Sequence, residues 1–165
     1  MGAFMSVLLF LLVQEPYELN LKAKDRSIAY MEMHVVKDYE IDIQGVNSVI
    51  NAKRAMRFDD RDEFYEIDGV LRNRGLINTL RANKAISKGE EILLDGDVYY
   101  ARSDDFTLKS ERLFYHRGEK KLSSDTFFVA TYGPHESKGE GFVYGIESEI
   151  LEAWKIDANI KMEKL

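Results

Sequence analysis

The sequence contains no cysteine among its 165 residues. Disulfide bonds, a thiolate nucleophile and any metal site built on cysteine are therefore excluded. Proline is scarce as well, because only Pro16 and Pro134 occur and neither falls inside a good strand pattern. An excess of basic residues is also missing: the formal charge of −6 argues against a nucleic-acid partner. With 45% hydrophobic and 12% aromatic residues, the chain has enough apolar material for the core of one domain.

Long hydrophobic runs are absent, apart from one short stretch near the start. Gly2 to Val13 carries no charged side chain. As a helix this stretch would extend roughly 18 Å, short of the roughly 30 Å hydrocarbon layer of a membrane. Three interpretations stay open: a membrane anchor that lacks its first residues, an export signal, and a buried helix. We therefore divide the chain into an N-terminal anchor or export segment, residues 1–16, and a β-domain, residues 17–165.

What the sequence does contain is alternation of apolar and polar residues with a period of two. Such alternation predicts half-buried strands, because successive side chains in a strand point to opposite faces. Gly96 lies in the middle of one of these segments and indicates a bulge or bend. Ala52 to Phe58 is the best candidate for a helix. The predicted strands include Tyr17 to Leu21, Tyr39 to Ile43, Tyr65 to Ile67, Ile92 to Tyr100 and Phe127 to Tyr132.

The turns between these segments form a repeat. Ser87-Lys88-Gly89-Glu90 and His116-Arg117-Gly118-Glu119 each follow an apolar strand and lead into another. A fainter hairpin runs from Asp42 to Val70 and turns at residues 59–62. Polar breaks at Arg72 to Gly75, Ser103 to Asp105 and Gly133 to Gly141 separate the units. Stacked hairpins of one type predict a repetitive all-β architecture, namely a jelly roll or flattened barrel of antiparallel strands.

The last 18 residues of the chain alternate most strictly. Ser148 to Leu165 is predicted to be one strand, with Trp154, Ile156 and Ile160 on the buried face and Lys155 and Asp157 on the wet face. A terminal strand has no successor in the chain to pair with its outer edge. Its unpaired N–H and C=O groups can recruit a strand from a partner.

Catalytic or metal-binding patterns are weak. The acidic residues from Asp59 to Glu63 contain Arg61, which favours a solvated hairpin tip over a cation site. Glu147 and Glu149 share a strand face, the minimum for paired-carboxylate chemistry, but the wet side of the last sheet is the favoured explanation for them. The three histidines lack ligand or triad spacing, and no phosphate loop is present. We predict that the protein is not an enzyme and uses no cofactor or metal.

At this point the chain resembles the LptC family, a component of lipopolysaccharide export. The resemblance rests on Tyr39-Glu40-Ile41-Asp42-Ile43-Gln44-Gly45-Val46, on the turns at Gly89 and Gly118, on Leu94-Asp95-Gly96-Asp97-Val98-Tyr99, and on Gly145 ahead of the final strand. Related bridge and outer-membrane components share most of these motifs. The resemblance implies an open, twisted jelly roll of antiparallel strands, and we expect the short apolar segment that precedes it here to be helical.

The resemblance also implies a function. A member of this family is anchored in the inner membrane by one span, with its β-domain in the periplasm. It accepts lipopolysaccharide from an inner-membrane ABC transporter and passes it to a periplasmic bridge protein by docking jelly rolls edge to edge. The lipid A acyl chains lie in an apolar trough. A side chain at Gly145 should disturb the docking edge.

These expectations assign residues, although for each inward residue an ordinary core role stays an alternative. The candidate lipid contacts are Ile92, Leu94, Val98, Tyr100, Leu108, Phe128, Trp154, Ile156 and Ile160. The candidate docking residues are Gly145, Trp154, Lys155, Ile156, Asp157, Ala158, Asn159, Ile160, Lys161 and Met162. Three other functions remain open: a soluble bridge of the same system with a cleaved N-terminus, a carbohydrate-active β-sandwich enzyme using Glu147 and Glu149, and a purely structural strand-swapping protein with a filled interior.

Overall fold

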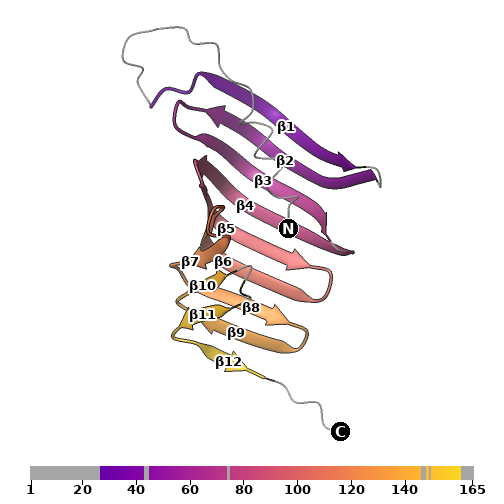
Figure 1. The fold of residues 1–165 in the computed structure, drawn as a ribbon, viewed down its shortest axis with the longest axis vertical. Coiled ribbons are helices and arrows are strands. Elements are labelled where there is room, and N and C mark those ends of the chain that lie inside the picture. The colour runs from indigo at the N-terminus through magenta and orange to yellow at the C-terminus, as the bar shows by residue number, and fades with distance from the viewer. Residues whose placement is uncertain (1–26, 43–44, 74, 146–147, 149, 161–165) are drawn as a thin grey trace.

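The protein forms one antiparallel sheet of twelve strands in the part of the chain that the structure describes (Figure 1). The structure is a computed structural model, and it describes residues 27–42, 45–73, 75–145, 148 and 150–160. The strands are β1 (Met31–Asp42), β2 (Gly45–Arg57), β3 (Asp62–Asn73), β4 (Leu76–Lys88), β5 (Glu91–Arg102), β6 (Phe106–His116), β7 (Lys121–Ser124), β8 (Phe128–Tyr132), β9 (His135–Gly139), β10 (Gly141–Gly145), β11 (Leu151–Trp154) and β12 (Asp157–Asn159).

The sheet forks at β6. From β1 to β6 each strand pairs with the next in the chain, so the first half is a series of hairpins. The end of β6 at Phe114 to His116 then pairs with β7, whereas its start at Phe106 to Ser110 pairs with β8. One branch continues as β7, β10 and β11, and the other as β8, β9 and β12. The first branch, together with the adjoining halves of β4 (Lys84–Lys88), β5 (Glu91–Asp95) and β6 (Arg112–His116), is called the β7 arm. The second branch, together with the opposite halves Asn78–Arg81, Val98–Arg102 and Phe106–Ser110, is called the β8 arm. The chain passes repeatedly between the two arms.

The long strands bend along one line, which we call the seam. Regular pairing is interrupted or shifted at this line in all five strand pairs from β1 to β6. Backbone φ is positive at several seam positions, as is typical of bulges, which increase local bending. Gly96 has a φ of 78°, and a Cβ there would lie 2.8 Å from Asn83 Nδ2, so glycine is required. The seam comprises Val35, Lys53, Glu66, Asn83, Gly96 and Asp97.

Polar contacts join neighbouring strands across the seam. Lys53 forms an ion pair with Glu66, and Asn83 Nδ2 donates a hydrogen bond to Asp97 Oδ2 at 3.1 Å. Where the chain last passes from one arm to the other, between β11 and β12, Lys155 has a φ of 50° and forms an ion pair with Glu140. These side chains are exposed, so the seam presents a polar outer surface.

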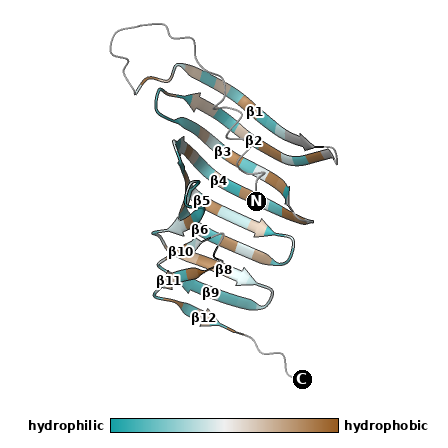
Figure 2. Ribbon diagram, in the orientation of Figure 1, coloured by the Kyte–Doolittle hydropathy of each residue, from teal (hydrophilic) through white to brown (hydrophobic). Residues whose placement is uncertain are grey.

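The core lies between the two arms. Phe128 on β8 and Phe142 on β10 are not on hydrogen-bonded strands, yet their rings meet edge to face at 5.1 Å between centroids. This contact places the inner faces of the arms against each other. Colouring by hydropathy shows hydrophobic and hydrophilic residues alternating along the strands (Figure 2). The buried core cluster comprises Ile67, Leu80, Ala82, Ala85, Ile92, Leu94, Val98, Leu108, Leu113, Phe128 and Phe142.

The predicted all-β fold of antiparallel hairpins is confirmed, as are the turns at Gly89 and Gly118. The helix predicted from Ala52 to Phe58 is wrong, because β2 runs through Arg57. The inward-facing positions of β2 shift by one residue at the seam, so Ala52 and Ala55 are both buried. Their spacing of three residues resembles that of the buried face of a helix. The polar break predicted at residues 133–141 contains β9 and the start of β10.

The single terminal strand predicted from Ser148 onward is also wrong. The structure has two short strands there, β11 and β12, which belong to different arms. Residues 1–16 and the strand predicted from Tyr17 to Leu21 lie outside the described residues. In the described part of the chain, no helix is long and apolar enough to cross a membrane.

Candidate functional site

The centre of the interior contains five of the candidate lipid-contacting residues. Ile92 and Val98 are only 1% and 2% exposed, and they lie on opposite sides of the bulge in β5. Because these side chains are closed to solvent, the centre is packed as an ordinary core in this conformation. Acyl chains can enter here only if the side chains or the arms move apart. The five residues are Ile92, Leu94, Val98, Leu108 and Phe128.

Tyr100 extends the inner face of the β8 arm toward the free ends of the strands. Its half-buried ring packs against the core and contacts the edge of Phe106, with 6.1 Å between centroids. Its hydroxyl donates a hydrogen bond to Asn78 Oδ1 at 2.6 Å, and burial raises the pKa of that hydroxyl. Tyr100 is therefore the candidate lipid contact that combines an inward position with access to solvent.

Charged side chains gather at the strand ends beyond the core. On the β8 arm, Arg102 donates two hydrogen bonds of 2.7 Å to Asp104 and lies over the ring of Phe106. On the other side, Arg57 pairs with Asp62 through Nε to Oδ1 at 2.8 Å and Nη2 to Oδ2 at 3.2 Å. The interior therefore changes from an apolar centre to polar strand ends.

The predicted solvated hairpin tip between β2 and β3 holds for the exposed Asp59 but not for Asp62 and Glu63, which are buried at the start of β3. Glu63 accepts hydrogen bonds from Arg61 Nε at 2.6 Å and from the Tyr65 hydroxyl at 2.6 Å, and it pairs with Lys84 at 2.8 Å. Burial alone would raise the pKa of Glu63, but these contacts outweigh burial and lower the pKa to about 2. Arg61 and Lys84 therefore neutralise the charge of Glu63, and Arg57 neutralises the charge of Asp62.

The C-terminal candidates lie apart from the core. Trp154, Ile156 and Ile160 are 51%, 54% and 71% exposed. Trp154 pairs with Gly141, whereas the inward Phe142 pairs with Ala153, so Trp154 lies on the outward face of β11. Its predicted inward position is wrong because Lys155 lies at the seam crossing, where the parity changes.

After Lys155, the inward and outward positions of β12 are those that the alternation predicts. Ala158 pairs with Ser137, which in turn pairs with the inward Ala130, so Ala158 continues the inner face of the β8 arm. Ile160 follows β12 and is exposed. Lys155, Asp157 and Asn159 are also exposed. Within the described residues, β11 pairs only with β10 and β12 only with β9, so both arms end in a free strand edge. Lys161 and Met162 lie outside the described residues.

Gly145 ends β10 at the turn into β11. Its N–H donates a hydrogen bond to Ile150 O at 3.0 Å, and the Ser148 hydroxyl donates one to Gly145 O at 3.4 Å. A Cβ at Gly145 would lie 2.3 Å from Ser148 Oγ, so a side chain there requires the Ser148 hydroxyl to move and to give up its hydrogen bond to Gly145 O. The contact connects Gly145 to the β11 edge.

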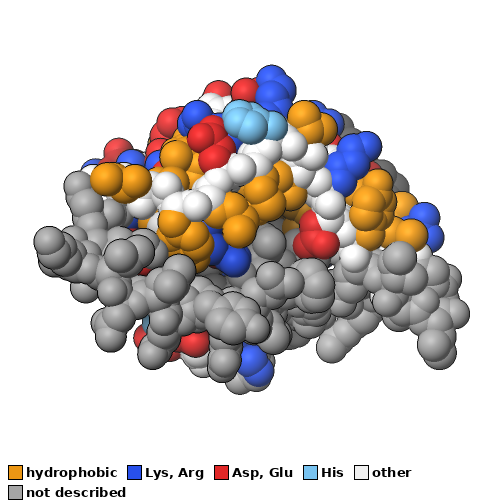
Figure 3. All heavy atoms as spheres, turned by 90° about the horizontal axis from the view of Figure 1, so that it is seen from above, with side chains coloured by type: hydrophobic (Ala, Val, Ile, Leu, Met, Phe, Trp, Pro, Cys, Tyr) orange, Lys and Arg blue, Asp and Glu red, His pale blue; other side chains and the backbone are white. Residues whose placement is uncertain are grey.

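The opposite end of the sheet is the β1 edge. Within the described residues β1 pairs with β2 alone, and it exposes the apolar side chains of Met31, Val35 and Tyr39. Viewed from above, this end shows hydrophobic side chains lying among charged ones (Figure 3). The described part of the sheet therefore has one free strand edge at the β1 end and two at the other end, those of β11 and β12.

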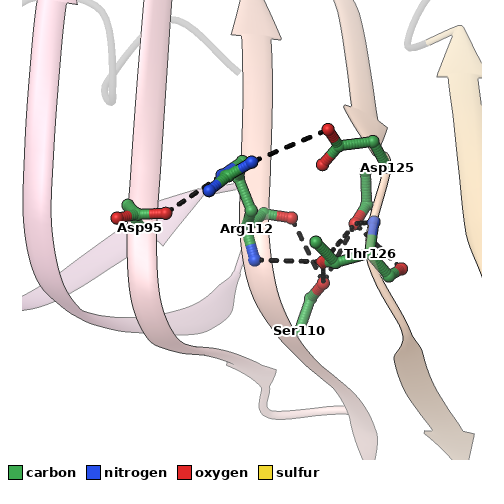
Figure 4. Close-up of polar contacts among 6 residues, drawn as sticks. Asp95, Ser110, Arg112, Asp125 and Thr126 are labelled. Carbon is green, nitrogen blue, oxygen red and sulfur yellow. Dashed lines mark hydrogen bonds and ion pairs between the residues drawn. The ribbon is translucent and has the colours of Figure 1, made fainter.

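A hydroxyl cluster that the sequence did not reveal stabilises the fork at β6 (Figure 4). Ser110 Oγ lies 3.0 Å from both Ser124 Oγ and Thr126 Oγ1, and it donates to Phe127 O at 3.2 Å. Arg112 contacts Asp95 at 3.0 Å and Asp125 at 3.7 Å. The short polar run after β7 was the available signal, but sequence cannot show that it meets the middle of β6.

The residues considered for catalysis are not brought together where the structure describes them. Glu147 and Glu149 lie outside the described residues. His34 is on β1 and His135 on β9, while His116 accepts a hydrogen bond at Nδ1 from the Glu119 amide at 3.1 Å. The described residues thus offer an apolar interior and the free edges of β1, β11 and β12 as binding features.

Comparison with known proteins identifies the family. The family model described as "Lipopolysaccharide-assembly, LptC-related" matches residues 2–153. A similar solved structure is that of LptH, the LptA-homologous periplasmic component of the lipopolysaccharide transport device from Pseudomonas aeruginosa. It is 15% identical, with a TM-score of 0.45, and the match covers 84% of this chain and 99% of that one. No curated protein sequence matches significantly. Because the family model covers most of the sequence, the chain belongs to the LptC-related family of lipopolysaccharide-assembly proteins.

Proposed function

We propose that this protein carries lipopolysaccharide through the periplasm, holding the lipid A acyl chains between its two arms. It receives the lipid from the inner-membrane ABC transporter at the β1 edge and passes it to a periplasmic bridge protein at the edges of β11 and β12. The N-terminal segment anchors the protein in the inner membrane as a single span. No chemical step on the lipid is part of this proposal.

The observation that carries the proposal is the inner face of the β8 arm. Its apolar side chains run from the buried Val98 through the half-buried Tyr100 and Ala130 to the exposed Ala158 on the last strand. Each acyl methylene removed from water contributes about 0.8 kcal/mol, so several chains could be held by this surface. The polar strand ends then leave a sugar head group in water.

The free edges of β1 at one end of the sheet and of β11 and β12 at the other support the docking part of the proposal. A free edge can form backbone hydrogen bonds with a strand of another protein. Such pairing would join the interior of one jelly roll to that of the next. A lipid could then move between proteins without leaving an apolar surface.

Lipopolysaccharide binding by a matched pair of variants tests the proposal. Tyr99 and Tyr100 are neighbours on β5, but they lie on opposite faces, and Tyr99 faces outward beneath Lys109. Tyr100→Glu should weaken binding at least tenfold, because it places a charge on the lipid surface. Tyr99→Glu should bind as the wild type does. Equal affinities for two folded variants would contradict the proposal.

A structural strand-swapping protein is the alternative that the packed centre favours, because Ile92 and Val98 leave no access to solvent in this conformation. That function requires free edges but no lipid site. It predicts that the wild type assembles through its edges and binds no lipopolysaccharide in the same assay. The soluble bridge component stays possible as well, and the mass of the mature N-terminus separates it from the anchored form.

A further inference from the structure

Arg117 is a buried cation at the edge of the interior. It lies in the turn between β6 and β7 and is 7% exposed. Its Nη2 donates a hydrogen bond to Ser87 Oγ at 3.2 Å, and its Nη1 reaches Gly89 O at 3.5 Å. Ser87 is buried on the same face of β4 as the core residue Ala85. The guanidinium therefore lies on the inner side of the β7 arm.

The charge of Arg117 has no counter-ion among the described residues. Its partners are a hydroxyl and a carbonyl oxygen, and its Nε has no hydrogen-bond partner. Asp62 is on the strand next to Ser87, but both of its carboxylate oxygens are bound by Arg57. A buried charge normally has a partner of opposite sign, because removing it from water is costly.

The position of this charge fits an anionic amphiphile. Ser87 pairs with Ile92, and Ile92 pairs with Tyr115, so the guanidinium adjoins the apolar wall of the core. Acyl chains lying against that wall would leave a head group at the strand ends, where Arg117 lies. A guanidinium presents N–H donors in a planar fork that matches two phosphate oxygens.

We propose that Arg117 binds a phosphate group of the lipid whose acyl chains occupy the interior, with Ser87 orienting the guanidinium. This inference rests on the proposed function, and it adds recognition of the charged head group to it. The bound phosphate supplies the counter-ion that Arg117 otherwise lacks. Nothing covalent changes in this step.

The test measures binding of two probes to the full chain: phosphorylated lipid A, and the same lipid A after its phosphates have been removed. Each is titrated against the wild type, Arg117→Gln, Arg117→Lys and Arg81→Gln. Arg81 is the matched control, because it is exposed and pairs with Asp68 at 3.1 Å away from the interior. Circular dichroism checks that each variant folds. Inorganic phosphate is added as a competitor in a separate series.

We expect the wild type to bind the phosphorylated probe at least about tenfold more tightly than the dephosphorylated one. Arg117→Gln should remove this preference and leave binding of the dephosphorylated probe unchanged. Arg81→Gln should keep the preference, and Arg117→Lys should keep part of it. Inorganic phosphate should reduce the preference of the wild type, because it offers the same oxygens without acyl chains.

Several results would overturn the inference without touching the proposed function. Equal binding of both probes by the wild type is decisive, and it holds even if Arg117→Gln fails to fold. A folded Arg117→Gln that keeps the full preference is equally contradictory. If the wild type binds neither probe, the proposed lipid-binding function itself has failed, and this inference falls with it.

Discussion

Among single residues, Glu63 shows how the hairpin between β2 and β3 couples stability to pH. Its folded pKa of about 2 is below the ordinary value of 4.5. A depressed carboxyl pKa contributes stability that is present above the unfolded pKa and is lost as pH falls toward the folded pKa. We expect Glu63→Gln to lower the free energy of unfolding at pH 7 by about 1–3 kcal/mol. Urea denaturation at several pH values measures this difference.

The pH dependence of this stability difference shows whether the Glu63 carboxylate causes it. The difference between the wild type and Glu63→Gln should shrink between about pH 4.5 and 2, because Glu63 becomes protonated there. Glu91→Gln, at an exposed position, should behave as the wild type does. A Glu63→Gln difference that stays constant from pH 7 to pH 2 would show that the effect is steric.

Gly139 is a second position that matters at this scale, because the surrounding atoms leave no room for a side chain. A Cβ there would lie 2.7 Å from the Phe128 ring and 2.9 Å from Trp154 O. Gly139→Ala must therefore displace either a core aromatic or the β11 backbone, and we expect a loss of about 1–3 kcal/mol. Gly118→Ala is the control, because its nearest contact would be 3.6 Å. Equal melting temperatures for the two variants would refute the packing argument.

The candidate residues illustrate what a sequence can predict at this scale. Ile92, Leu94 and Val98 were assigned to the inward face from their alternation, and they are buried. Trp154 was assigned by the same reasoning and lies outward, because the backbone reverses its parity at Lys155. Alternation therefore predicts the face of a residue beyond a seam crossing only where the crossing keeps the parity, as it does between Leu94 and Val98. The binding role of every one of these residues stays a prediction.

At the scale of elements, the hairpins were predictable and the arms were not. Turns with glycine and short polar runs mark where a chain reverses, so β4 to β7 follow from the sequence. Which half of β6 pairs with β7 and which with β8 depends on contacts between distant segments. The polar strand β9 was missed because its residues, His135 to Gly139, lack an apolar period.

Strand β5 offers a test of the packed centre. Val98 is almost fully buried, so Val98→Glu places a carboxylate where no partner is available in the apolar cluster around it. We expect this variant to lose about 3 kcal/mol or more of stability. Val70→Glu is the matched control, because Val70 is 40% exposed on β3. Chemical denaturation compares them, and similar midpoints would mean that the centre is open.

At the scale of the whole molecule, the described part of the chain is one forked sheet with free strand edges at both ends. The strand β12 pairs only with β9 among the described residues, and its side chains are exposed. Deleting residues 155–165 should therefore abolish binding of the bridge protein while the melting temperature falls by only a few degrees. Pull-down and calorimetry on the same sample separate the two effects. A truncated domain that still binds its partner fully would move the docking edge elsewhere.

The central claim is that lipid lies between the arms and not on the outer surface. The most direct measurement places a photoreactive amino acid at Tyr100 or at Tyr99 and records crosslinks to lipopolysaccharide in intact cells. Tyr99 and Tyr100 are adjacent on β5 and face opposite sides of the sheet, so the two crosslinkers differ mainly in the face that they probe. The account predicts a strong lipid adduct at position 100 and a weak one at position 99. Equal adducts, or a stronger one at position 99, would contradict it.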